Sequence, residues 1–331
     1  MKQAVLQSGK GIETLEIREV AMPQPGPGEA LVRLQAATLN FRDLIMAKGL
    51  IPGIAKEPEL VPLSCAAGMV EAVGDGVTRV KAGDRVTPQF TIGWITGAQP
   101  TPTMLGGSID GVAQQYAIYP AESLVLNPDE LGDLEAATLA CAALTSWSAL
   151  TGFRPTSPGD WILAHGTGGV SIAALQFAKA MGAQVIVTSS SDAKLSRARS
   201  LGADVTVNYR TTPNWAAAIR DAIGGAKVTN VIDTVGATQF ADNASLLVEG
   251  GQLSAIGMLG SEFSWTRQDP RVDLKPIGVG NRDQHEAMLA FIVAHRIKPV
   301  VDVVYDLDRI RDAFHMLESG QFFGKVGVNL L

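Results

Sequence analysis

Residues Trp161 to Ser171, WILAHGTGGVS, decide the fold of this 331-residue chain. An apolar run typical of a buried strand ends at His165, a glycine-rich turn follows, and the next residues have the composition of a helix. Strand-like and helix-like segments then alternate from residue 160 to residue 257. Alternation of this kind requires right-handed crossovers, so the sequence predicts an α/β fold with a doubly wound parallel sheet.

The N-terminal part of the chain has a different pattern. Short strand-like segments there are separated by glycine and proline turns, and the pattern changes near Asp133 to a helical run of small residues. A chain of 331 residues is long enough for two domains. We expect a β-rich domain built from residues 1–125 and 297–331, and a parallel-sheet domain over residues 126–296, because the last segments are again strand-like.

Composition excludes several classes of protein. The chain is 46% hydrophobic and 18% charged, values typical of globular proteins. Its net charge of −6 comes without a basic run, so no nucleic acid or anionic membrane partner is expected. No apolar stretch reaches the ~20 residues that span a bilayer, and the N-terminus lacks the apolar core of a signal peptide, so we expect a cytoplasmic protein. The two cysteines, Cys65 and Cys141, are interpreted as buried thiols.

The glycine-rich turn indicates a dinucleotide site. Gly166 permits the tight turn, and Gly168 lets the backbone approach a pyrophosphate. The N-terminus of the following helix offers free N–H groups and the positive end of its dipole to that anion. Ser171 replaces the third glycine of the usual fingerprint and is small enough for close packing of helix on strand.

The next strand end indicates which dinucleotide binds. The strand AQVIVT is followed by Ser189, Ser190 and Ser191, with Lys194 one turn into the next helix. Hydroxyls and an ammonium suit the 2′-phosphate of NADP(H), whereas NAD(H) sites carry an acidic residue there. NADP(H) is favoured. Ser191 or Asp192 could instead only cap the helix, which leaves NAD(H) open.

Longer stretches carry a family resemblance. They are PGPGEALVRLQAATLNFRDL, AAGMVEAVGDGVTRVKAGDRV, LGGSIDGVAQQYAIYPAESLVLNPDEL, EAATLACAALTSWSAL, GTGGVS with ARSLGADVTVNY, and the closing FGKVGV. Over nearly its whole length the chain resembles the medium-chain dehydrogenase/reductase superfamily, and within it the quinone oxidoreductase-like branch. The resemblance implies a GroES-like catalytic domain from both chain ends, a Rossmann domain between them and a substrate cleft. It also implies a homodimer formed through a sheet edge near residues 276–280.

The chain departs from the zinc-dependent branch of that superfamily. Asn40, in NFRD, stands where those enzymes carry a cysteine ligand, and Ser64 and Cys65 stand where they carry a His-Glu pair. Residues 88–110 contain no cysteine, so the structural zinc lobe is missing as well. Because a catalytic zinc site needs about three protein ligands, no metal is expected.

Without a metal, the best-suited chemistry is hydride transfer from NADPH to an electrophile that is already activated. The sequence therefore predicts reduction of a quinone or an α,β-unsaturated carbonyl. Two alternatives remain open: an alcohol dehydrogenase or carbonyl reductase of the same fold, and a non-catalytic NADPH-binding sensor.

Asn40, an orienting group, and Asp43 are the candidate catalytic residues. The expected cofactor-binding residues are Asn40, Thr145, Gly166, Thr167, Gly168, Gly169, Val170, Ser189, Ser190, Lys194, Tyr209, Gly257, Met258 and Asn281. Asn40 and Thr145 are implied to lie near the nicotinamide, and Tyr209 near the adenosine, by the resemblance. Other interpretations stay open for several of these residues.

Asn40 could cap a loop, and Asp43 could only start a helix. Tyr209 could be a rim aromatic, and Asn281 could be a helix cap. Asp233, at the end of a predicted strand, could brace a loop.

Overall fold

A computed structural model describes residues 1–100, 103–257 and 269–331. By its contacts the chain divides into two compact units, Met1–Leu144 with Val279–Leu331, and Thr145–Gly278. The predicted division near residues 125 and 296 rests on a change of sequence pattern and stays a prediction. In the part of the chain that is described, no helix has the length and apolar character needed to cross a membrane.

The unit Thr145–Gly278 is built on a parallel sheet. Within the described residues this sheet has six strands in the order β11-β10-β9-β12-β13-β14, and every neighbouring pair is parallel. The strands are β9 (Trp161–His165), β10 (Gln184–Ser189), β11 (Val205–Asn208), β12 (Val228–Asp233), β13 (Leu247–Ala255) and β14 (Val272–Pro276). The order reverses between β9 and β12, which confirms the predicted doubly wound sheet.

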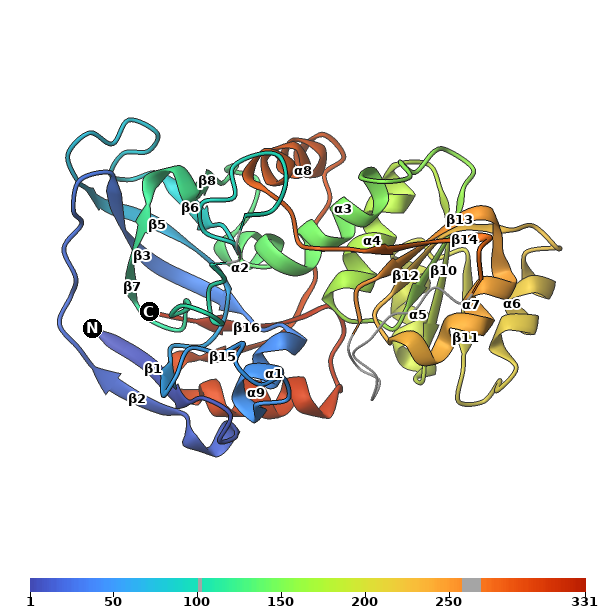
Figure 1. The fold of residues 1–331 in the computed structure, drawn as a ribbon, viewed down its shortest axis with the longest axis horizontal. Helices are drawn as coiled ribbons and strands as arrows, with labels where there is room; N and C mark the ends of the chain where they lie inside the picture. The colour runs from blue at the N-terminus through green and yellow to red at the C-terminus, as the bar shows by residue number, and fades with distance from the viewer. Residues whose placement is uncertain (101–102, 258–268) are drawn as a thin grey trace. The chain divides into compact units, whose positions relative to one another are not determined.

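Helices precede or connect these strands (Figure 1), and α4 to α7 pack on the sheet. They are α3 (Leu144–Thr151), α4 (Gly169–Ala180), α5 (Asp192–Ser200), α6 (Trp215–Ala222), η4 (Ala237–Gln239) and α7 (Phe240–Leu246). The sequence predicts a helix over residues 238–251, but α7 ends at Leu246. Leu247 instead pairs with Val228 in the sheet, because pairing of an apolar strand outweighs local helix propensity.

The other unit contains a mixed sheet around one long strand, in which β15 and β16 are parallel and the other neighbours are antiparallel. Its seven strands in the described chain are β3 (Glu29–Thr38), β5 (Cys65–Val73), β6 (Arg85–Pro88), β7 (Tyr116–Pro120), β8 (Leu124–Leu126), β15 (Val301–Asp306) and β16 (Lys325–Asn329). β5 pairs along one edge of β3, while β7 and β16 share the other edge. The last strand of the chain therefore lies in the sheet of the N-terminal region.

Smaller elements complete this unit. They are β1 (Lys2–Gln7), β2 (Glu16–Glu19), β4 (Glu59–Leu60), η1 (Ile12–Thr14), α1 (Phe41–Lys48), η2 (Ala121–Ser123), α2 (Asp133–Ala136), α8 (Arg282–Ala294), η5 (Leu307–Arg309) and α9 (Ile310–Ser319). The apolar faces of β1, β3, α1 and α9 form one hydrophobic core.

The helical run predicted after Asp133 is interrupted. α2 ends at Ala136, and Leu139–Ala143 form a π-helical segment, η3, before α3 begins. Single π-helical turns are rare inside α-helices and are frequent at functional sites. This turn contains Cys141.

Candidate functional site

The glycine turn after β9 has the geometry of an anion site. Gly166 has a positive φ of 78°, which favours glycine, and its N–H donates to the Thr188 carbonyl at 2.9 Å. Thr167 is buried, and Gly168 directly precedes α4. A Cβ built on Gly168 would meet no atom within 4 Å. Open space thus lies over Gly168 at the N-terminus of a helix, where backbone N–H groups bind anions.

The start of α4 is held to β9 by a serine. The Ser171 hydroxyl, in place of the third glycine, donates to the His165 carbonyl at 2.5 Å. Gly169 and Val170 form the first turn, and the Val170 carbonyl accepts from the Ser146 hydroxyl at 2.7 Å. The helix end is therefore rigidly attached to the strand that precedes it.

The carboxyl ends of β10 and β11 bring the next predicted residues together. The Tyr209 N–H donates to the Ser189 carbonyl at 3.1 Å, and the Tyr209 side chain is 45% exposed. Ser191 precedes α5, and its hydroxyl accepts from the Lys194 N–H at 3.4 Å, so Ser191 does cap this helix. Ser190 lies between these groups and is partly exposed. Hydroxyls, a helix N-terminus and a lysine thus meet at one edge of the sheet.

Gly257 follows β13, and the structure gives a further reason for a glycine here. Its N–H donates to the Asp233 carbonyl at 2.8 Å. A Cβ at this position would lie 1.9 Å from the Thr234 carbonyl carbon, so the neighbouring backbone requires glycine whether or not a cofactor is bound. Its predicted approach to the cofactor stays a prediction. Met258 lies outside the described residues.

Asp233 braces the turn after β12. Its carboxylate accepts from the N–H groups of Val235 at 2.7 Å and Gly236 at 3.0 Å, and from Asn243 Nδ2 at 2.8 Å. Asn243 Oδ1 in turn lies 2.8 Å from His165 Nε2. Burial raises the pKa of Asp233. This buried network fixes the strand ends beside the glycine turn.

Two other predicted cofactor residues have clear structural positions. Thr145 is buried in α3. Asn281 caps α8: its side chain accepts from the Gln284 N–H at 2.9 Å, and Gln284 Oε1 accepts from the Asn281 N–H at 2.9 Å. The alternative role of Asn281 as a helix cap is therefore observed, and its role at the nicotinamide stays a prediction.

Asn40 is the centre of a buried polar cluster, which we define as Asn40, Ser64, Cys65, Cys141 and Lys325. Asn40 Nδ2 lies 3.1 Å from Cys65 Sγ and 3.3 Å from Ser64 Oγ, and donates to both. Asn40 Oδ1 accepts from Lys325 Nζ at 2.5 Å. Lys325 also donates to the Leu39 carbonyl and is only 5% exposed. Both ends of the amide are thus occupied, and a buried ammonium lies beside it.

The two cysteines meet in this cluster. The two thiols interact, and each shifts the pKa of the other. Burial alone raises the pKa of Cys65, but the Cys141 hydrogen bond, the Lys325 charge and the Asn40 hydrogen bond together lower it to about 6. The shared hydrogen bond and burial raise the pKa of Cys141. The surroundings of Cys65, with its amide and ammonium neighbours, thus favour ionisation of this thiol over that of Cys141.

Asp43 has a structural role at the start of α1. Asp43 Oδ2 accepts from the Asn40 N–H at 2.7 Å, and Oδ1 lies 3.8 Å from Arg42 Nη1. The side chain is buried, and burial raises the pKa of Asp43. This contact supports the interpretation of Asp43 as a helix-start residue that holds the Asn40 backbone.

Sequence reasoning missed Lys325 and the pairing of Cys141 with Cys65. Lys325 lies in the quoted FGKVGV motif, where one charged residue interrupts an apolar strand, and this was the available signal. Cys141 belongs to the quoted CAALT stretch. The sequence predicts Cys65 alone at this place, whereas the structure adds a second thiol.

The donors of the cluster do not suit zinc. They are two thiols, a hydroxyl and an amide whose oxygen is already bound to an ammonium. Zinc prefers three or four Cys, His or carboxylate ligands, and a neighbouring ammonium repels the ion. Across residues 1–100, 103–257 and 269–331, no group of three such side chains is placed to hold a metal.

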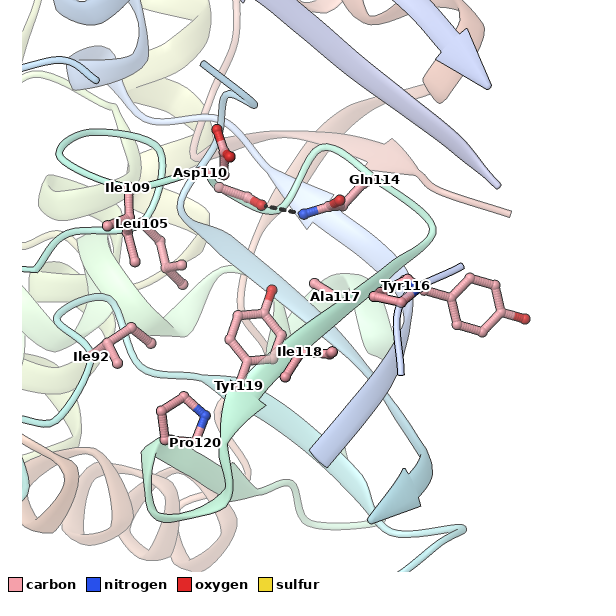
Figure 2. A pocket seen from close by; sticks show the side chains of 12 residues that line it. Ile92, Leu105, Ile109, Asp110, Gln114, Tyr116, Ala117, Ile118, Tyr119 and Pro120 are labelled. Atoms are coloured by element: carbon pink, nitrogen blue, oxygen red, sulfur yellow. Dashed lines mark hydrogen bonds between the residues drawn. The ribbon is translucent and has the colours of Figure 1, made fainter. Parts of the chain in front are cut away.

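A separate pocket of about 360 Å³ lies along β7 (Figure 2). Ile92, Leu105, Ile109 and Tyr119 contribute to its lining. Gln114, on the same wall, donates to the Gly111 carbonyl at 2.9 Å. None of the predicted site residues lines this pocket, so it is distinct from the polar cluster.

Comparisons with known proteins agree with this architecture. Residues 26–129 match the model of the alcohol dehydrogenase GroES-like domain, and residues 169–294 match the zinc-binding dehydrogenase model. A zinc-type alcohol dehydrogenase-like protein of Schizosaccharomyces pombe is 40% identical over 330 residues, covering 96% of this chain and 95% of that protein. An alcohol dehydrogenase of Geobacillus stearothermophilus is 34% identical over 347 residues, covering 98% of each.

Solved structures give the same result. An NAD-dependent alcohol dehydrogenase matches with a TM-score of 0.90 and 32% identity, over 99% of both chains. The mycobacterial protein Rv1454c, solved with NADPH, matches with a TM-score of 0.84 and 27% identity, over 99% of this chain and 100% of that one. The predicted combination of a GroES-like domain and a Rossmann-like domain is confirmed. The chain belongs to the medium-chain dehydrogenase/reductase superfamily and is a nicotinamide-dependent oxidoreductase related to the alcohol dehydrogenases.

Proposed function

We propose that the protein transfers hydride from NADPH, without zinc, to a quinone or an α,β-unsaturated carbonyl. The observation that carries the proposal is the buried contact between Lys325 and Asn40, at 2.5 Å, in the cluster that also holds both thiols. An amide stands at an expected ligand position there, and an ammonium lies beside it. A substrate that is already electrophilic does not require a Lewis acid.

The preference for NADPH rests on the edge formed by β10 and β11. Ser189, Ser190 and Lys194 offer hydroxyl and ammonium donors, and α5 directs its N-terminus to the same edge. These groups would hold a 2′-phosphate. The open space over Gly168 would hold the pyrophosphate. When bound there, the cofactor supplies the hydride.

The chain's own residues then orient groups and stabilise charge. Asp43 holds the Asn40 backbone, and Lys325 holds the Asn40 amide oxygen, so the direction of the amide N–H is fixed. The buried ammonium adds a positive potential, which lowers the free energy of an enolate or quinolate oxygen in the transition state. Solvent can protonate that oxygen, so no acid residue is required.

The test follows oxidation of NADPH and NADH against matched quinones, enones, aldehydes and ketones. The protein is used before and after treatment with a chelator, and its metal content is measured. We expect faster oxidation of NADPH than of NADH with quinones or enones, unchanged by the chelator. The matched control is Gly168→Asp, which should weaken cofactor binding and reduce turnover at a limiting NADPH concentration.

The names of the relatives favour a second candidate, alcohol dehydrogenase or carbonyl reductase activity. The same assay separates the two. Turnover of simple alcohols, aldehydes or ketones that is lost with the chelator and restored by zinc would refute the zinc-free proposal. Tight NADPH binding with no turnover of any acceptor would instead support a sensor.

We also propose a homodimer formed through β14, which is the last strand of its sheet in the described residues. An exposed strand edge can pair with the same edge of a second copy. Light scattering at micromolar concentration tests this, and a mass of one chain would contradict it.

A further inference from the structure

We infer that Cys65 and Cys141 are a redox-active dithiol, which closes to an intramolecular disulfide on reaction with a hydroperoxide and reopens with a small thiol. This modification site is independent of the substrate assigned above. It rests on the placement of two backbone segments, on the groups around Cys65 and on the accessibility of Cys141.

The two cysteines lie on segments that are tied together. Cys65 begins β5 and pairs with Thr38 of β3. The Thr38 hydroxyl donates to the Ala137 carbonyl at 2.7 Å, two residues before η3 begins, and η3 itself packs against β5. The π-helical turn that packs on β5 contains Cys141, and Cys65 is the first residue of β5, so the two cysteines lie on neighbouring segments and interact electrostatically. A disulfide requires this kind of close approach between two fixed segments.

The surroundings give the two sulfurs different roles. Cys65 is fully buried, and it faces the Asn40 amide at 3.1 Å and the Lys325 charge. A nearby cation and hydrogen-bond donors stabilise a thiolate, which is the reactive form. Cys141 is partly exposed, so a small oxidant can approach from its side. Cys65 is therefore the attacking sulfur, and Cys141 is the resolving one.

The reaction balances with a hydroperoxide as the oxidant. The Cys65 thiolate attacks the terminal oxygen, so an S–O bond forms and the O–O bond breaks. The leaving alkoxide takes the Cys141 proton and departs as an alcohol. The Cys141 thiolate then attacks the Cys65 sulfur: the S–S bond forms, the S–O bond breaks, and hydroxide leaves to be protonated by solvent. Two electrons pass from the two sulfurs to the peroxide.

Closure of this disulfide would change the polar cluster. It removes the anion that faces Lys325, while the ammonium stays bound to Leu39 and Asn40. A buried charge without its counter-ion is unfavourable, so the oxidised cluster should relax.

Intact-mass spectrometry and thiol titration of the unfolded chain test the inference directly. The chain has two cysteines, so any intramolecular disulfide must join this pair. One equivalent of hydroperoxide should give a mass loss of about 2 Da and no titratable thiol, and dithiothreitol should restore both. Cys65→Ser and Cys141→Ser should each abolish the loss. Retention of both thiols, or dimers on a non-reducing gel in place of the mass loss, would overturn the inference.

A second pair of variants tests the role of the cation. Lys325→Met should slow formation of the disulfide about tenfold at pH 7 and move its pH midpoint upward, because the thiolate loses its charge partner. Lys10→Met, at an exposed position, is the matched control and should behave as the wild type. Equal rates in both variants, with folding verified by circular dichroism, would contradict the assigned roles. These readouts do not depend on enzymatic turnover, so they can fail or succeed independently of the proposed function.

Discussion

The glycine turn and the polar cluster are assembled in opposite ways. The turn comes from one continuous stretch, Trp161–Ser171, whose residues lie in sequence order along β9 and α4. The cluster comes from Asn40, Ser64 with Cys65, Cys141 and Lys325, which are far apart in sequence. A local sequence pattern is enough to predict a site such as the glycine turn. A site such as the polar cluster appears only when β16 pairs with β3 and η3 packs on β5.

The two regions also differ in the surroundings of their residues, and therefore in what a substitution should affect. Gly168 faces open space, whereas Lys325 is enclosed by hydrogen-bond acceptors. A change in the turn should therefore affect binding and leave the fold intact. A change in the cluster should affect the fold as well, and this contrast can be tested one residue at a time.

The largest effect is expected for Lys325→Met. The variant leaves the Leu39 carbonyl and the Asn40 amide oxygen without their donor, and removes the charge beside the Cys65 sulfur. Removing one partner of a buried charged network costs about 3 kcal/mol or more of unfolding free energy. Urea denaturation measures the unfolding free energy of the variant. Lys10→Met should change the unfolding free energy by less than about 0.5 kcal/mol. A loss for Lys325→Met no larger than that of Lys10→Met would show that the cluster is not a stabilising unit.

Gly168→Asp should act on the cofactor alone. A carboxylate at this position finds room in the free protein but repels a pyrophosphate at the helix N-terminus. We expect the Kd for NADPH to rise about 100-fold, equivalent to about 2.7 kcal/mol. Fluorescence titration measures the Kd, and the melting temperature without cofactor should stay that of the wild type. Unchanged NADPH affinity would remove Gly168 from the site.

The features that could be predicted from the sequence are those that, like the glycine turn, depend on local patterns. Alternation of strands and helices predicts the parallel sheet, and the strand ends predict where Ser189 and Tyr209 meet, because both depend on residues close in the chain. The end of α7 at Leu246 and the π-helical turn at Cys141 escape the pattern. Both depend on tertiary packing: Leu247 joins the sheet, and η3 packs on β5.

The polar cluster shows why the rest could not be predicted. A resemblance draws attention to Asn40 and Cys65, because they stand at expected ligand positions. It includes Lys325 in a matching motif but gives this residue no role, because that role depends on the register of β16 against β3, where Gly327 pairs with Thr38. The spacing of residues in the sequence does not predict the register between two strands so far apart in the chain.

We expect Gly257→Ala to lower the unfolding free energy of the protein, whereas Gly168→Asp should leave it unchanged. Its Cβ would lie 1.9 Å from the Thr234 carbonyl carbon, so the backbone of one segment must shift. Overpacking of this kind costs about 2 kcal/mol. The measurement is the unfolding free energy of the protein without cofactor. A wild-type value, together with weakened NADPH binding, would mean that Gly257 serves the cofactor and not the packing of β12 against β13.

The smallest effect is expected at the strand end that distinguishes the two dinucleotides. Ser190 is partly exposed beside Ser189 and α5, so Ser190→Asp places a carboxylate near the expected 2′-phosphate without burying it. Repulsion should reduce the ratio of kcat/KM for NADPH to that for NADH about tenfold, equivalent to about 1.4 kcal/mol. Ser190→Asn, which has a similar shape but no charge, is the matched control. The decrease should shrink as salt is added, because exposed charges are screened. An equal decrease in both variants would indicate a steric cause. No decrease in either would mean that this edge does not contact the 2′-phosphate, and the NADP(H) preference would then need another source in the chain.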